Sequence, residues 1–248
     1  MVWYYIIVFF MIAGEAVVGF GSTSIGIPLL SLSLGTEASV ALLSASGLVL
    51  CFLVISTQYK KVRIREFLVI IACIVPIMPV GYLLYAKLRL YEGVLKLTMG
   101  AVIAYVSIRA IYWRLIRKRE NITSKFGMYL ALGVGAVVQG MFSTGGALIN
   151  VYTASRIQDK SEFRATMVAV WITTNVISLI YRVLVLHMYT KTICMSIVYA
   201  LPLIVVAFLI GNRIHQLVPN EKFMNWVYIV QLISGLIAIA AGIGALVS

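Results

Sequence analysis

Charged residues are scarce in this chain of 248 residues: they make up 11% of it, and only 8 are acidic. A soluble domain carries about 25% charged residues. Charges are nearly absent from runs of about 18 or more residues, which is long enough to cross a hydrocarbon core of about 30 Å. This scarcity excludes a soluble domain. It indicates one polytopic, multi-pass domain over residues 1–248 in the cell (inner or plasma) membrane.

Residue patterns typical of enzymes and metal sites are also lacking. The three cysteines, Cys51, Cys73 and Cys194, stand alone in apolar runs, so they form neither a metal motif nor a disulfide framework. There is no His-Glu-x-x-His, no Cys-x-x-Cys, no phosphate-loop lysine and no Ser/His/Asp set. We therefore expect no enzymatic activity, no metal and no cofactor.

Basic residues are the charges that the chain does have, and they give a net charge of +12. They flank the apolar runs in short loops, so orientation in a membrane explains them better than nucleic-acid binding does. A basic surface that attracts anionic substrates stays open. The expected partners are a small anionic substrate and the lipid bilayer, with no nucleic acid. A homodimer is left open.

Apolar runs occupy most of the chain and fall into two sets of four. They lie at about 2–34, 38–58, 67–86, 91–113, 126–155, 163–187, 192–214 and 223–247. We predict an all-α membrane fold with two internal repeats, about 1–118 and 119–248. Each repeat has a broken or re-entrant first helix that is followed by three transmembrane helices.

The first run of each half contains a break of small and polar residues. At an offset of 121 residues, Gly19 matches Gly140, and Ser22-Thr23 matches Ser143-Thr144. Lipid cannot satisfy the backbone groups that a break leaves unpaired, so a break survives where it faces protein or a watery cavity. Matched breaks in two halves of a chain are typical of a transporter binding site.

Loop charges discriminate between two paths for these long first runs. If every run spans the membrane, the two sides carry 10 and 8 basic residues; if the first run of each half turns back, they carry 14 and 4. The positive-inside tendency favours the second count. The prediction is an inverted repeat with both termini outside and the basic loops in the cytoplasm. A steeply tilted, kinked helix is the alternative.

The residues of the two breaks suit a small oxyanion. Hydroxyl residues are preferred helix N-caps, and we expect half-helices to start near Ile25 and Ala147, with free N–H groups pointing at the breaks. Tight helix packing through small residues is the alternative reading. The predicted substrate-binding residues of the breaks are Gly21, Ser22, Thr23, Ser24, Ser143, Thr144, Gly145 and Gly146.

Three polar residues inside the runs complete the predicted site. Glu15 lies one turn before the first break and is the candidate proton-coupling residue, although it matches only Ala136 in the other half. Asn175 and Arg182 share one face of the sixth run and are predicted to bind the substrate. For Arg182, snorkelling to the membrane interface is the alternative.

These motifs resemble the TauE/SafE family of membrane transporters, also grouped as toluene sulfonate uptake permeases. Gly21-Ser-Thr-Ser-Ile-Gly26-Ile-Pro28-Leu29-Leu30 is similar to the first copy of the family's break, and the stretch from Gly140 to Asn150 to the second. Phe163-Arg164-Ala165-Thr166 is similar to the opening of the helix that follows. The resemblance implies secondary transport of sulfite or small organosulfonates such as sulfoacetate.

The leading hypothesis is thus a secondary transporter of a small sulfur-containing oxyanion. The anion would be held at the membrane midplane by the two breaks and moved by alternating access, with proton coupling left open. The alternatives are a passive anion channel and a non-transporting scaffold subunit of a membrane complex.

Overall fold

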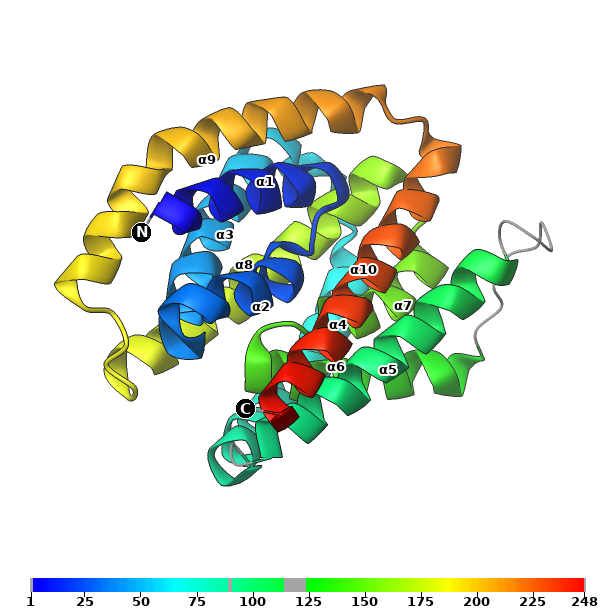
Figure 1. Cartoon of the computed structure of the whole chain (residues 1–248). Helices are drawn as coiled ribbons and strands as arrows, with labels where there is room; N and C mark the ends of the chain where they lie inside the picture. The colour runs from blue at the N-terminus through cyan, green and yellow to red at the C-terminus, as the bar shows by residue number, and fades with distance from the viewer. Residues whose placement is uncertain (1, 89–90, 114–123, 248) are drawn as a thin grey trace.

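The computed structural model describes residues 2–88, 91–113 and 124–247, which form ten α-helices and one 3₁₀ turn and contain no strand (Figure 1). The first half has α1 Val2–Val18, α2 Ser22–Leu34, α3 Thr36–Gln58, the turn Tyr59–Lys61, α4 Ile64–Leu88 and α5 Glu92–Ile111. The second half has α6 Lys125–Phe142, α7 Gly146–Arg156, α8 Lys160–Leu184, α9 Lys191–Leu217 and α10 Asn220–Val247. The predicted all-α fold is confirmed.

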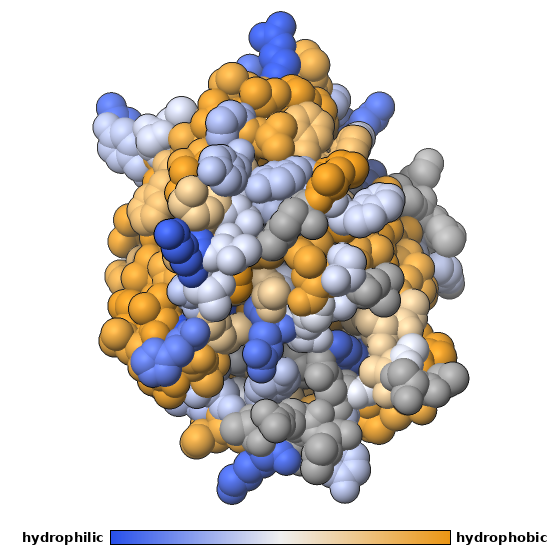
Figure 2. Space-filling view, turned by 60° about the vertical axis from the view of Figure 1, so that its left-hand side comes forward, coloured by the Kyte–Doolittle hydropathy of each residue, from blue (hydrophilic) through white to orange (hydrophobic). Residues whose placement is uncertain are grey.

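Six of the described helices are long and apolar enough to cross a membrane: α3, α4, α5, α8, α9 and α10. Their apolar parts are 19 to 27 residues long, which at about 1.5 Å per residue matches the bilayer core. Three of them follow each broken helix, as the sequence predicts. Hydrophobic residues cover both flanks of the molecule, and more hydrophilic residues gather between them (Figure 2).

Each first run turns back at its break and does not continue as one tilted helix. The ring centroids of Tyr129, at the start of α6, and Tyr152, near the end of α7, lie 5.7 Å apart. In the first half, Gly26 of α2 packs against Met11 of α1. Figure 1 shows α2 returning beside α1. Both first runs are therefore helical hairpins, as the re-entrant path requires, and the single kinked helix is wrong.

Several turns lie together on one face of the molecule, where ion pairs and hydrogen bonds join them. Arg63 Nε lies 2.8 Å from Glu162 Oε2, and Arg156 Nε lies 3.6 Å from Glu66 Oε2. The ammonium group of Lys160 donates to three carbonyl oxygens at the end of α9. We call this the basic face; it contains the turns 59–63, 156–160 and 217–220.

The opposite face carries the turn 185–190, where the Tyr189 hydroxyl donates to the Ala41 carbonyl oxygen at 3.2 Å. The two faces correspond to the two sides in the predicted count of 14 basic residues against 4. Four of those 14 residues and one of the 4 lie outside the described residues: Arg114, Arg117, Lys118 and Arg119, and Arg89.

The first helix of each half packs on a helix of the other half, α1 on α9 and α6 on α4. Glycines allow both contacts: a Cβ added at Gly81 would lie 2.3 Å from the Val137 oxygen, and one at Gly211 would lie 2.5 Å from the Ala13 oxygen. Close approach through small residues is the usual packing of membrane helices. An inverted repeat predicts such reciprocal pairs, and the equivalence of the two halves stays a prediction.

We expect Gly81→Leu to prevent folding, because the added side chain would collide with the backbone of α6, which cannot move as a flexible side chain can. Overpacking of this kind costs roughly 1–3 kcal/mol or more. The matched control is Gly133→Leu on α6, since a Cβ there meets nothing within 4 Å. Size-exclusion profiles in detergent measure the result. A monodisperse peak for Gly81→Leu would contradict the packing described.

Candidate functional site

Both hairpins turn through left-handed residues: Gly19 with φ 87° and Gly21 with φ 113° in the first, and Ser143 with φ 56° in the second. Just before each turn, a side chain reaches forward to the next helix. Glu15 Oε2 accepts a hydrogen bond from the Ser22 amide at 3.0 Å, and Gln139 Oε1 accepts one from the Gly145 amide at 3.0 Å. Gly19 and Ser143, like Glu15 and Gln139, are 124 residues apart.

An offset of 124 residues aligns these turns and these side-chain hydrogen bonds, whereas the offset of 121 aligns the Gly and Ser-Thr letters of the two breaks. Under the offset of 124 the counterpart of Glu15 is Gln139, and under the offset of 121 it is Ala136. The register of the two halves stays a prediction. Each half thus carries one side chain that caps its own half-helix, an acid in the first half and an amide in the second.

The half-helices begin at Ser22 and Gly146, earlier than the expected Ile25 and Ala147. The N-cap residues are glycines, Gly21 and Gly145, and neither makes a side-chain cap. The prediction that the Ser and Thr hydroxyls cap the half-helices is wrong. Glu15 and Gln139 satisfy the first amides instead, so those N–H groups are not all free for a ligand.

Both hairpin tips meet at a small buried cavity of about 20 Å³. It is lined by Glu15, Phe20, Gly21, Ser22, Thr23, Ser24, Gly47, Gln139, Ser143, Gly146, Trp171 and Asn175. We call it the inner cavity; its volume suits about one water molecule. The Thr23 hydroxyl donates to the Ser143 carbonyl oxygen at 3.0 Å and joins the two tips. The Ser22 hydroxyl is buried and has no partner among the described residues.

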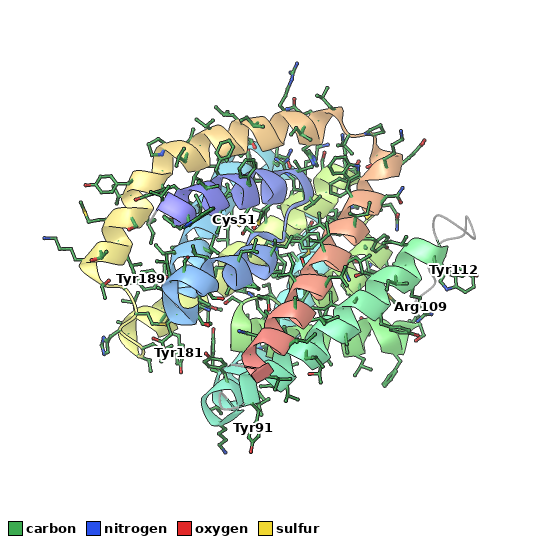
Figure 3. All side chains as sticks on the ribbon, viewed as in Figure 1. Cys51, Tyr91, Arg109, Tyr112, Tyr181 and Tyr189 are labelled. Carbon is green, nitrogen blue, oxygen red and sulfur yellow. The ribbon has the colours of Figure 1, made fainter. Side chains whose placement is uncertain are left out.

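A larger cavity of about 220 Å³ extends from the opposite face towards the tips. We call it the vestibule. Its lining includes Glu37 and Lys96 near the helix ends of the opposite face, and Ser24, Thr144 and Arg182 deeper in. Aromatic rings form part of its wall: Tyr82 and Tyr181 stack with their centroids 4.4 Å apart. Figure 3 labels Tyr181 near the end of α8.

Arg182 is the charged group that connects the vestibule with a tip. Its side chain is 5% exposed, its Nη1 donates to Ser44 Oγ at 2.9 Å, and its Nη2 donates to Ser143 Oγ. Among the described residues, no carboxylate forms an ion pair with it. The guanidinium is therefore a buried cation held by neutral hydroxyl groups, an arrangement that leaves its charge available to an anion.

Nearly all of the predicted site residues come together. Asn175 lines the inner cavity, whereas Thr144 and Arg182 line the vestibule next to it. Gly145 lines neither cavity, because it packs on the helix before it: a Cβ there would lie 2.1 Å from the Gly135 oxygen.

Three side chains of the second half hold the end of α1, and the sequence reasoning missed this role. Arg164 Nη1 donates to the Ala16 oxygen, His215 Nδ1 bonds the Val17 oxygen, and Trp171 Nε1 donates to the Gly19 oxygen, each at 2.8 Å. The end of a helix leaves carbonyl groups unpaired, and inside a membrane they need donors from the protein. Arg164, expected as a charge at the flank of the membrane, is fully buried.

Two hairpins whose helix starts meet at a buried polar cavity, beside long apolar helices, are typical of the membrane-transporter class. A family model described as Sulfite exporter TauE/SafE matches residues 4–239. The chain belongs to this family, which confirms the predicted resemblance. The family implies membrane export of sulfite or a related sulfur anion. No curated protein and no solved structure matches the chain.

Proposed function

We propose that the chain is a secondary transporter that carries sulfite or a small organosulfonate such as sulfoacetate by alternating access around the two tips. The observation that carries the proposal is Arg182, a buried cation with hydroxyl partners that reaches from the vestibule to Ser143. Such a group attracts an anion of limited size. Family membership supports sulfur as the central atom.

The two cavities support an assignment of sides. The vestibule reaches the tips from the opposite face, while the inner cavity holds about one water molecule. If the basic face lies in the cytoplasm, as the positive-inside tendency favours, this conformation is open to the outside of the cell membrane. The opposite conformation would open the route from the tips to the basic face.

Glu15 is our candidate for the coupling of protons to anion movement. When ionised, its carboxylate occupies the amide of Ser22 at the start of α2, where a substrate anion would also bind. A proton on Glu15 would remove this competing charge. The titratable groups of neighbouring helices that face this end of α1 are Cys51 of α3, Arg164 of α8 and His215 of α9.

Counterflow in proteoliposomes tests the proposal. Purified protein is reconstituted with unlabelled sulfite or sulfoacetate inside, and uptake of the labelled anion is followed with and without a pH gradient. We expect saturable exchange, stimulated by the gradient. Currents without saturation would favour the passive channel. No flux of either anion, with correctly folded protein in the membrane, would count against transport and favour the scaffold alternative.

A further inference from the structure

Two buried amide side chains have no role in the site described above. Asn150 of α7 is 0% exposed and Gln231 of α10 is 1% exposed. Neither the nitrogen nor the oxygen of either amide has a hydrogen-bond partner among the described residues. Unsatisfied polar groups inside a protein are costly and rare, so four such atoms on two adjoining helices need an explanation.

Both residues continue a helix face that lines a cavity, one turn closer to the basic face. On α10, Ser234, Ala238 and Ala241 line the vestibule, and Gln231 lies three residues before Ser234 on the same face. On α7, Gly146 lines the inner cavity, and Asn150 lies four residues beyond it in the direction of Arg156 on the basic face. The two helices are in contact.

We propose that Asn150 and Gln231 are oxyanion-binding residues of the closed half of the pathway, which the anion contacts after it passes the tips. This inference rests on the proposed function. Each amide supplies two N–H donors, which suit an oxyanion that has left Arg182. Neutral amides bind an anion less strongly than a second buried cation would, which favours release towards the basic face.

The substitutions Asn150→Leu and Gln231→Met separate this role from a structural one. Both keep the approximate shape and length of the side chain and remove polar atoms that are unpaired in the conformation described. We expect the thermal midpoint in detergent to stay unchanged or rise, whereas counterflow of sulfite and sulfoacetate falls at least about tenfold, the size of one lost hydrogen bond to a charged group. The matched control is Ile229→Leu, on the exposed side of α10.

Two outcomes would overturn the inference: wild-type counterflow in both variants, or a lower thermal midpoint with no loss of transport per folded molecule.

A second measurement tests the inference separately from the proposed function. If the wild type carries neither anion, the proposed function fails, but the accessibility of the two positions can still be measured. Asn150→Cys and Gln231→Cys are made in a chain with Cys51, Cys73 and Cys194 replaced by alanine.

An impermeant thiol reagent is then added from the side of the basic face, with and without sulfoacetate. The inference expects both cysteines to be labelled, while Ile70→Cys, in the fully buried core of α4, stays protected. Protection of both positions under every condition would overturn it.

Discussion

Replacing Arg182 by methionine should abolish transport while making the empty protein more stable. The guanidinium is buried without a carboxylate partner in the described part of the chain, so its removal relieves a desolvation cost. The same change removes the cation that attracts the substrate. A lost charged partner costs at least about 2 kcal/mol, so we expect binding to weaken at least about 30-fold.

Thermal unfolding in detergent, with and without sulfite, measures both effects of Arg182→Met. Wild type should unfold at a higher temperature when sulfite is present, and the variant should lose that increase. Arg109→Met is the matched control, since Arg109 also lies in a spanning helix but is exposed at the end of α5, away from the vestibule (Figure 3). Arg182→Lys should keep part of the transport. Full stabilisation of Arg182→Met by sulfite would exclude Arg182 from the site.

The second large effect is expected from Glu15→Gln, which gives the first hairpin the same amide cap that Gln139 gives the second. The side-chain oxygen that bonds the Ser22 amide is kept, so the hairpin should fold. The titratable proton is lost. We expect exchange of labelled anion to continue, while accumulation driven by a pH gradient falls at least about tenfold, as removal of a proton carrier requires.

The reciprocal variant, Gln139→Glu, provides the matched test of the same idea. It adds a titratable cap at the second hairpin and should make exchange steeper in its dependence on pH. Glu15→Leu is the third member of the series: it leaves the Ser22 amide without its cap, which costs roughly 1 kcal/mol of stability. If Glu15→Gln still concentrates the anion in response to a pH gradient, the proton is carried elsewhere.

Composition and loop charge were enough to predict most of the architecture. The scarcity of charge predicted the spanning helices, and the count of 14 against 4 basic residues favoured the hairpins that α1–α2 and α6–α7 form. The position of Arg182 in an apolar run predicted it as a site residue, because a charge there is costly unless it has a function, and the structure places it at the wall of the vestibule. These features depend on local composition, which the sequence states directly.

Features that depend on backbone conformation or on packing between distant parts of the chain could not be predicted from the sequence. Ser143 takes the left-handed conformation that glycines take in the first hairpin, and nothing in the sequence marks a serine for that conformation. The burial of Arg164 depends on contact with Ala16, which is 148 residues earlier in the chain. In the sequence, Asn150 is only the last residue of the stretch that resembles the family's second break, because its lack of a partner is visible only when all surrounding helices are placed.

The packing of α1 on α9 has a consequence for synthesis in the cell. At about 5–20 residues per second, the ribosome needs on the order of ten seconds or more after α1 to produce α9. During this time the carbonyl groups at the end of α1 lack His215, which arrives with α9. Insertion of the hairpin α1–α2 is therefore completed late. A chaperone or insertase that shelters the nascent first hairpin should raise the yield of folded protein more than any help given to the last helix.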